Sequence, residues 1–328
     1  MTALEKVTKG IAEIAGRYAD RRVSIFDVQV EAGDPVRLTG RVLEAGQLAE
    51  LRQLGADVSG VQVMRRAENA QRAVRVNLTS LHGEPGWLAE QVSQLLYGME
   101  LEILAEKGNW GLVRQTDGYL GWAYLPYLTS TPLAAPTHLA LAPISLLHPE
   151  PEAPAVVGRV LGGTYVAVQS IRNGWAQIEG PNGGWLPLNS LRALNALPQT
   201  PAERRAQIVT DAFQLMGVQY LWGGCSAHGI DCSGLAQLAH RWIGITIPRD
   251  ADMQYDAGKQ VEYPFKPGDL LFFGEQGERR SITHVGISLG GWEILHSSRS
   301  RNGVYTDNVQ AVAGLRDSFL FGATFIGD

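Results

Sequence analysis

The sequence has few cysteines and no long apolar run. Its two cysteines, Cys225 and Cys232, lie close together in a glycine-rich loop, which fits a reducing compartment better than a disulfide framework. The seven histidines are scattered and the cysteines lack zinc spacing, so we expect no metal and no cofactor. No apolar run approaches the ~20 residues that span a bilayer, and residues 1–22 have neither the basic start nor the apolar core of a signal peptide. We therefore expect a cytoplasmic protein with no membrane association.

An excess of basic residues is also missing. The chain has 28 Lys and Arg against 33 Asp and Glu, which gives a net charge of −5. A nucleic-acid binder usually gathers Lys and Arg on one face, so we expect no nucleic-acid partner. With 328 residues, of which 45% are hydrophobic, the chain is large enough for two to four domains.

Residues 1–70 have the pattern of a small α/β domain. An amphipathic helical stretch is followed by two alternating stretches, a second helix and a further strand, in the order αββαβ. The segment contains no catalytic constellation, so its role is unknown.

An internal repeat occupies the next part of the chain. SLHGEP at 80–85 returns as LLHPEP at 146–151, and Trp110 and Trp122 return as Trp175 and Trp185. Each copy has short β-patterned runs separated by Gly and Pro turns, which favours a small barrel. We assign the copies to residues 72–130 and 137–195, with linkers rich in Thr, Pro and Ala after each.

The stretch 220–234 reads YLWGGCSAHGIDCSG and leads into a run with helical spacing that begins at Cys232. At the first turn of a helix, unpaired amides and the helix dipole stabilise an anion, so a thiol with an ordinary pKa of ~8.5 can fall toward neutrality. Asp231 and Ser233 flank this position, and helix capping alone would explain both. Cys225 has no helix start of its own and is interpreted as a bystander.

A base for such a thiol is available on a later strand. His284 lies in the alternating strand 282–289, and His296 follows after a glycine turn. The two histidines share a face only if the loop between them has an odd number of residues, or an equivalent bulge. In that register Gly286 opposes His296, and the histidines become diagonal neighbours.

Five strings in this order resemble the NlpC/p60 family of bacterial cell-wall cysteine peptidases: DCSGL, PRDADMQ, KPGDLLFFG, ITHVGISLG and ILHSS. The resemblance covers about residues 203–328, and the two repeats resemble bacterial SH3-like domains. It implies an α+β chain with a papain-like catalytic domain at 203–328. This domain is preceded by two small SH3-like β-barrels and the small α/β N-terminal domain.

The resemblance also implies roles for particular residues. Cys232 would be the nucleophile, His284 the base and His296 the residue that orients the base. Tyr220 would place its hydroxyl near the oxyanion, with the amide of Cys232 as a second donor. Substrate-binding roles would fall to Asp231, to Ser233 and to Asp250, whose carboxylate would bind the ammonium of an N-terminal L-alanine. Asp250 precedes a helical turn, so capping would explain that residue as well.

Two further candidates lie in the first SH3-like repeat. In the branch of the family that carries such domains, the first one helps wall the active site, where an acidic residue and a tyrosine bind the free amino terminus of the substrate. By position these would be Glu84 and Tyr119. In the second repeat, Glu150 stands at the position equivalent to Glu84, but Asn182 stands at the position equivalent to Tyr119. The barrel itself therefore does not require the tyrosine.

The implied activity is that of a γ-D-glutamyl-L-diamino-acid endopeptidase in cell-wall recycling, acting on peptidoglycan peptides with a free N-terminal L-Ala. A wall-remodelling hydrolase of intact peptidoglycan is the main alternative. A thiol acyltransferase would need an open acyl pocket, and a binding module with a vestigial peptidase would have a broken triad, whereas all three positions are present. The sequence does not indicate whether diaminopimelate or lysine is preferred, nor the oligomeric state.

Overall fold

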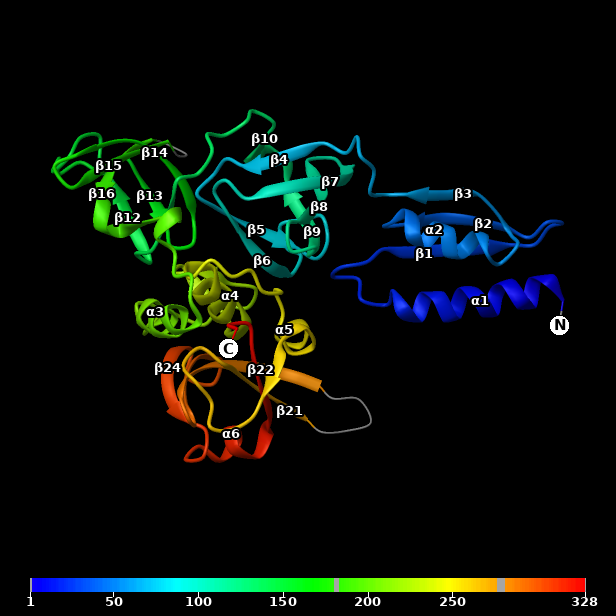
Figure 1. Ribbon diagram of the computed structural model, residues 1–328. Coiled ribbons are helices and arrows are strands. Elements are labelled where there is room, and N and C mark those ends of the chain that lie inside the picture. The colour runs from blue at the N-terminus through cyan, green and yellow to red at the C-terminus, as the bar shows by residue number, and fades with distance from the viewer. Residues whose placement is uncertain (1, 180–182, 276–280, 328) are drawn as a thin grey trace. The chain divides into compact units, whose positions relative to one another are not determined.

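The structure is a computed structural model that describes residues 2–179, 183–275 and 281–327. The described chain, drawn as a ribbon in Figure 1, divides into two units. The first contains residues 2–72, 84–87 and 100–126, and the second contains residues 73–83, 88–99 and the described residues from 127 onward. Each unit is considered by itself, and the division into four domains stays a prediction.

The first unit begins with a three-stranded sheet and two helices. Strand β2 pairs antiparallel with β1 and parallel with β3. Helix α1 starts at a capping box between Thr2 and Glu5 and turns Val7, Ile11 and Ile14 into the core. The elements in chain order are α1 (Ala3–Arg17), β1 (Phe26–Glu31), β2 (Arg37–Val42), α2 (Ala45–Arg52) and β3 (Asp57–Val63).

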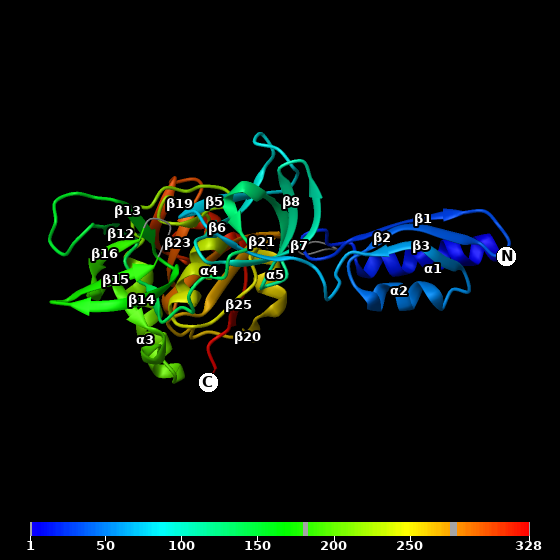
Figure 2. The same cartoon turned by 90° about the horizontal axis from the view of Figure 1, so that it is seen from above.

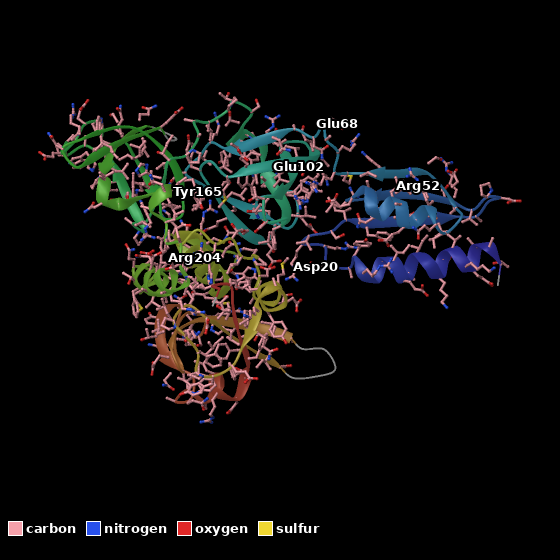
Figure 3. The ribbon with its side chains drawn as sticks, in the orientation of Figure 1. Asp20, Arg52, Glu68, Glu102, Tyr165 and Arg204 are labelled. Atoms are coloured by element: carbon pink, nitrogen blue, oxygen red, sulfur yellow. The ribbon has the colours of Figure 1, made fainter. Side chains whose placement is uncertain are left out.

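The rest of the first unit is an antiparallel meander of three strands, β7 (Glu100–Lys107), β8 (Trp110–Gln115) and β9 (Leu120–Tyr124). Its buried Leu104 and Leu120 share a core cluster with Leu43 and Met64. Glu102, labelled in Figure 3, accepts hydrogen bonds from Arg65 Nε and Asn69 Nδ2, each at 3.1 Å. The meander and the segment after β3 are therefore joined by both apolar and polar contacts.

The second unit starts with short antiparallel strands. β5 pairs with β6, and a five-stranded sheet in the order β16-β15-β14-β11-β17 lies beside the pair β12-β13 around a shared apolar core. The strands are β5 (Leu78–His82), β6 (Gln91–Leu96), β10 (Leu128–Thr129), β11 (His138–Ala140), β12 (Ile144–Leu147), β13 (Gly158–Leu161), β14 (Tyr165–Arg172), β15 (Trp175–Glu179), β16 (Gly184–Pro187) and β17 (Leu191–Ala193), while β4 (Gln71–Val74) crosses from one unit to the other. Single 3₁₀ turns occur in this unit at η2 (Leu188–Ser190) and η3 (Leu194–Ala196), while η1 (Leu125–Tyr127) lies where the chain passes from the first unit to the second.

The remainder of the second unit is a six-stranded antiparallel sheet with helices. Its order is β20-β25-β21-β22-β23-β24. Helix α4 packs against β22, β23 and α3, and both views show it beside the sheet (Figures 1 and 2). The elements are α3 (Pro201–Phe213), β18 (Cys225–Ser226), β19 (Gly229–Ile230), α4 (Cys232–Trp242), α5 (Ala251–Ala257), β20 (Lys259–Val261), β21 (Leu270–Glu275), β22 (Ser281–Gly290), β23 (Glu293–Ser298), β24 (Gly303–Asn308), α6 (Ala313–Ser318) and β25 (Phe319–Thr324).

The core between α4 and this sheet holds α4 in place. Leu235, Trp242, Phe272 and Val285 are each 0% exposed and belong to one cluster. Full burial of such side chains stabilises the fold by about 1.5–3 kcal/mol each. The mixed α+β class expected from the sequence is confirmed. Within the described residues, no helix has the length and apolarity needed to cross a membrane.

Candidate active site

Cys232 is the first residue of helix α4, as the sequence predicted. The helix begins here because Asp231 adopts an extended conformation and its Oδ1 accepts the amide N–H of Gly234 at 2.7 Å. The thiol is partly buried, and the backbone N–H groups of Val285 and Ser233 donate hydrogen bonds to its sulfur. The cap and the helix therefore fix the position of the candidate nucleophile.

The protonation of this thiol differs from the expectation. Burial, followed by the charge of Asp231, raises the pKa of Cys232 to about 12, although the two backbone donors oppose the shift. The expected fall toward neutrality is therefore wrong for the free protein, because desolvation of the sulfur outweighs the helix terminus. The thiol is protonated at neutral pH and needs a base that takes its proton as it attacks.

The candidate base belongs to a row of hydrogen-bonded side chains on β22, β23 and β24. His284 Nε2 lies 2.7 Å from His296 Nδ1, and His296 Nε2 lies 2.9 Å from Asp307 Oδ2. Asp307 Oδ1 in turn accepts a hydrogen bond from Arg301 Nη1 at 2.8 Å. The structure thus brings the two predicted histidines together and adds two residues to them.

The strand register explains why the histidines meet. Ile287 pairs with Leu295, which puts Gly286 opposite His296, and the register then shifts between Ser288 and Gly290. Leu289 is the extra residue of this bulge, and the turn itself has two residues. The register expected from the sequence is confirmed, with the bulge in place of an odd loop. A Cβ on Gly286 would lie 2.9 Å from Ile294 Cδ1 and 3.3 Å from His296 Cβ, so a side chain at this position would crowd both residues of β23.

Both histidines are neutral at neutral pH. Burial, with a smaller effect of His296, lowers the pKa of His284 to about 3. Burial also lowers the pKa of His296, although its hydrogen bond to Asp307 works in the opposite direction. A neutral imidazole has one nitrogen lone pair available, so His284 is able to accept a proton.

Cys232 and both histidines line one cavity of about 460 Å³. The volume suits a short peptide segment. Its walls combine aromatic side chains with hydroxyl and guanidinium groups. The lining includes Tyr220, Trp222, Phe273, Thr283, Ser298, Arg299, Arg301, Asp307, Val312 and Leu315.

Tyr220 lies in this cavity, as its predicted role requires. Burial, followed by the charges of Cys232 and Asp231, raises the pKa of its phenol to about 12. The hydroxyl is therefore protonated at neutral pH and can donate a hydrogen bond to an oxyanion. The amide of Cys232, as the first of its helix, has no acceptor within the helix and is the second candidate donor.

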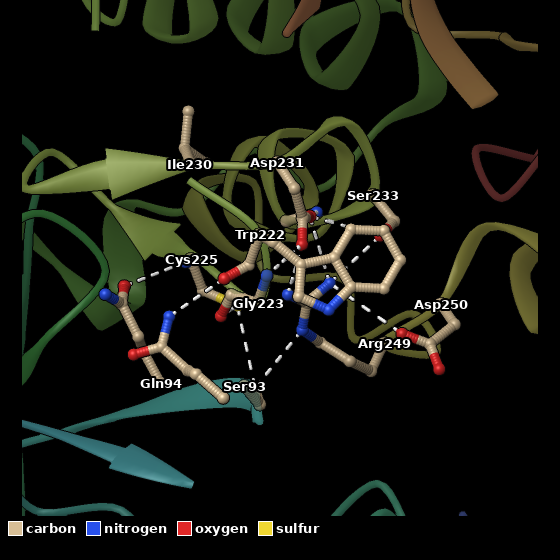
Figure 4. Close-up of polar contacts among 12 residues, drawn as sticks. Ser93, Gln94, Trp222, Gly223, Cys225, Ile230, Asp231, Ser233, Arg249 and Asp250 are labelled. Carbon is tan, nitrogen blue, oxygen red and sulfur yellow. Dashed lines mark hydrogen bonds and ion pairs between the residues drawn. The ribbon is translucent and has the colours of Figure 1, made fainter. Parts of the chain in front are cut away.

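Asp231 and Ser233 belong to a buried polar cluster with Arg249 (Figure 4). Arg249 Nη1 and Nη2 donate to the two oxygens of Asp231 at 3.1 and 2.7 Å, and Nη1 also donates to Ser233 Oγ at 2.9 Å. The amide of Gly223 donates to Asp231 Oδ2 at 2.9 Å. These contacts support a positioning role next to Cys232, and the substrate-binding roles of Asp231 and Ser233 stay predictions.

Strand β6 contributes to the same cluster. Ser93 Oγ accepts from Arg249 Nε at 3.2 Å and lies 3.6 Å from Cys225 Sγ. Gln94 Oε1 accepts from the amide of Cys225 at 2.9 Å (Figure 4) and from Ser226 Oγ at 2.8 Å. Cys225 is buried and lies within this network, so its position indicates packing and not catalysis.

The loop before the nucleophile is fixed at its other end by the first residue of the same strand and by Glu90, which precedes it. Trp222 Nε1 donates to Glu90 Oε1 at 2.7 Å, and its carbonyl accepts from Gln91 Nε2 at 3.0 Å. Gly223 has φ +73°, and a Cβ there would lie 2.4 Å from the carbonyl oxygen of Gln91. Only glycine fits this position, because both its conformation and the close backbone approach exclude a side chain.

Asp250 occupies the N-cap position of α5, but its side chain makes no capping hydrogen bond. Its Oδ1 lies 4.0 Å from Arg249 Nη1, and the side chain is 24% exposed. Capping therefore does not explain the residue, and its proposed contact with an ammonium group stays a prediction.

Glu84 and Tyr119 lie in the first unit, whereas Cys232 lies in the second. Their predicted roles at the substrate amino terminus stay predictions. Asn182, the counterpart of Tyr119 in the second repeat, lies outside the described residues.

Sequence reasoning missed Asp307, Arg301 and Arg249. Asp307 sits on β24, where Ile294 of β23 is its direct partner and His296 is diagonal to it. An alternating strand after ILHSS was the available signal, but its register cannot be read from one sequence. Arg249 belongs to the PRDADMQ string, and an arginine so close to the DCSG motif is a candidate partner for Asp231.

Comparisons with known proteins identify relatives of this chain. The model of the NlpC/P60 family matches residues 217–315. A gamma-D-glutamyl-L-lysine dipeptidyl-peptidase of Bacillus subtilis is 31% identical over 221 residues, which cover 63% of this chain and 72% of that protein. The chain belongs to the NlpC/P60 family. A Bacillus cereus protein of the same name is 29% identical over 65% of this chain and 68% of its own length.

Two further matches reach beyond the catalytic region of this NlpC/P60 protein. The model described as the bacterial dipeptidyl-peptidase Sh3 domain matches residues 81–124, which include Glu84 and Tyr119. The crystal structure of an NlpC/P60 family protein from Bacillus cereus aligns with a TM-score of 0.68 at 24% identity, over 78% of this chain and all of that one. The latter match supports the fold.

Membership of the family makes this protein a peptidase, and cysteine catalysis is the mechanism of the family. The resemblance seen in the sequence is thereby confirmed. Cys232, His284 and His296 all lie within the NlpC/P60 match, and their individual roles stay predictions.

Proposed function

We propose that this peptidase hydrolyses the bond between γ-D-glutamate and an L-diamino acid in peptidoglycan-derived peptides that have a free N-terminal L-alanine. The diamino acid is lysine or diaminopimelate. The peptides are fragments released from the wall, and the reaction serves cell-wall recycling in the cytoplasm.

The hydrogen-bonded row from Asp307 through His296 to His284, in one cavity with a helix-capped cysteine, carries the proposal of a cysteine mechanism. The bond specificity is supported by the two relatives named gamma-D-glutamyl-L-lysine dipeptidyl-peptidase. Their match extends beyond the catalytic region, and the SH3 match has the same kind of name.

The mechanism follows from the groups present. Cys232 sulfur attacks the γ-carbonyl carbon of D-glutamate while its proton moves to His284, and the carbonyl oxygen becomes an oxyanion near Tyr220 and the amide of Cys232. The C–N bond then breaks, and the diamino acid leaves with the proton from His284. Water next attacks the thioester, His284 takes a proton from that water, and the same proton returns to the sulfur.

The free amino terminus is the feature that would separate released peptides from intact wall. Peptides in intact peptidoglycan are blocked there by the lactyl group of the glycan. Asp250, in the same unit as Cys232, is the proposed partner of the ammonium. A blocked terminus would bury a neutral amide against this carboxylate in place of a cation, so discrimination should be large.

The test is cleavage of L-Ala-γ-D-Glu-L-Lys, its diaminopimelate analogue and the N-acetylated forms, with products identified by mass. We expect release of the free diamino acid from the unblocked peptides, at a kcat/KM at least about 100-fold above that of the acetylated ones. Cys232→Ala is the control for contaminating activity. Comparable kcat/KM values, or efficient lysis of intact sacculi, would reject the recycling role in favour of a wall-remodelling hydrolase.

A further inference from the structure

The row of side chains behind His284 ends in an ion pair for which catalysis has no direct use. Asp307 and Arg301 touch neither the thiol nor the candidate base, yet Asp307 bonds His296 and Arg301 bonds Asp307. We propose that Asp307, oriented by Arg301, sets the tautomer of both histidines, so that the lone pair of His284 Nδ1 is the one available to Cys232. Both are positioning residues in this scheme.

The first step concerns His296. A carboxylate can only accept hydrogen bonds, so the contact of 2.9 Å between Asp307 Oδ2 and His296 Nε2 requires a proton on that nitrogen. Burial lowers the pKa of His296, so the ring is neutral at neutral pH and its other nitrogen, Nδ1, carries no proton. Nδ1 of His296 is therefore a hydrogen-bond acceptor.

The second step concerns the candidate base, because the tautomer of His296 determines that of His284. His296 Nδ1 lies 2.7 Å from His284 Nε2, so the latter must be the donor and carry a proton. A neutral imidazole holds only one, which leaves Nδ1 of His284 with a lone pair. Since Nε2 is committed to His296, Nδ1 is the nitrogen that can take the proton of the Cys232 thiol. The opposite tautomer would present an N–H to the sulfur and could not act as a base.

Arg301 matters because it determines which atom of residue 307 faces the histidine. Its Nη1 donates to Asp307 Oδ1 at 2.8 Å, and its guanidinium stacks on Tyr305 with 4.4 Å to the ring centre. A guanidinium can only donate. In Asp307→Asn the amide oxygen would therefore face Arg301, and the amide NH₂ would face His296 Nε2. That contact requires a lone pair on Nε2, so both histidines would switch to the opposite tautomer.

The inference rests on the roles proposed for Cys232, His284 and His296, but its first test needs no substrate. Nitrogen-15 NMR of the histidine side chains distinguishes a protonated ring nitrogen from an unprotonated one. The Cys232→Ala chain is the sample, because it removes proton exchange with the thiol. His284→Ala and His296→Ala spectra assign the signals. We expect both histidines to carry the proton on Nε2 at neutral pH, and both to carry it on Nδ1 when Asp307→Asn is added.

Kinetics supply the second test. Asp307→Asn should lower kcat at least about 100-fold, by analogy with other triads in which the third group fixes a tautomer, with little change in KM. Adding Arg301→Met should restore much of that loss, because the amide can then turn its oxygen to His296. A purely structural role of the ion pair predicts the reverse, since the double variant would be worse. Asp317→Asn is the matched control: Asp317 pairs with Arg316 at 3.1 Å on the exposed surface, and its loss should leave kcat unchanged.

Several results would overturn the proposal. One is a proton on His296 Nδ1 in the Cys232→Ala chain, which is measurable even if Asp307→Asn folds poorly. Another is an Asp307→Asn kcat within threefold of the unsubstituted protein, or a double variant no more active than Asp307→Asn alone. If the expected tautomers were found but no glutamyl peptide were cleaved, the proposed function would fail and the tautomer assignment would stand.

Discussion

Replacing Arg249 by methionine tests the buried cluster beside the nucleophile. The Arg249 side chain is 1% exposed and that of Asp231 is 7% exposed. The substitution keeps most of the apolar volume but leaves a buried carboxylate without its cation. Breaking such a pair costs about 3–5 kcal/mol. Asp231 would keep the amides of Gly223 and Gly234 as donors, so we expect a loss of unfolding free energy near the lower end, about 3 kcal/mol.

A double-mutant cycle makes this number specific to the pair. Asp231→Asn should also destabilise the protein, and Arg249→Met with Asp231→Asn should lose less than the sum of the two. The control is Arg205→Met, which breaks the buried ion pair between Arg205 and Asp269. The Asp269 side chain is 2% exposed. Arg205→Met should lower stability but retain kcat, whereas Arg249→Met should lower both.

Unfolding in urea, followed by tryptophan fluorescence, measures these losses, and kcat is compared at a temperature where every variant is folded. An Arg249→Met protein whose free energy of unfolding lies within about 1 kcal/mol of that of the unsubstituted protein would refute the expected cost of breaking the ion pair. A double variant whose loss of unfolding free energy equals the sum of the two single losses would refute it as well, because the two charges would then be solvated independently.

Three other expectations follow from the site and the core. Cys232→Ala and His284→Ala should each lower kcat about 10⁴-fold or more because they act as one unit, while Cys225→Ala should stay active; an active Cys232→Ala protein would reject the assignment. Burial lowers the pKa of His240 to about 4, so below about pH 6.5 the unfolded chain binds a proton that the folded chain does not. The free energy of unfolding should therefore fall by about 3 kcal/mol as the pH drops to about 4. His240→Phe should flatten this pH dependence, measured by urea unfolding, and an unchanged dependence would show that His240 does not cause it. Arg299 is exposed in the cavity wall and has no ion-pair partner within the described chain, so Arg299→Ala should raise KM about fivefold because a contact with a substrate carboxylate is lost. Peptides amidated at the D-glutamate or at the diamino acid would identify which carboxylate Arg299 contacts. An unchanged KM of Arg299→Ala for the unamidated peptide would exclude the contact.

The features that were predictable from the sequence depend on local periodicity. The helix start at Cys232 follows from the run after it, and the shared face of His284 and His296 follows from strand alternation plus one extra residue. The features that were not predictable depend on the partner strand or on desolvation. Asp307 reaches His296 only through the register of β24 against β23. The raised pKa of Cys232 results from burial, whose size a linear sequence does not reveal.

The bonds from Ser93 to Cys225 and Arg249 bridge 132 and 156 residues of chain, and this has a consequence for how the protein is made. Strand β6 is synthesised long before its partners, and the loop between them must close before any of these contacts can stabilise it. The histidines follow later still. A nascent chain that has already emerged past α4 therefore has a cysteine but neither its base nor a completed cluster around it. The candidate nucleophile and the two histidines can therefore come together only after the chain has been made through β23.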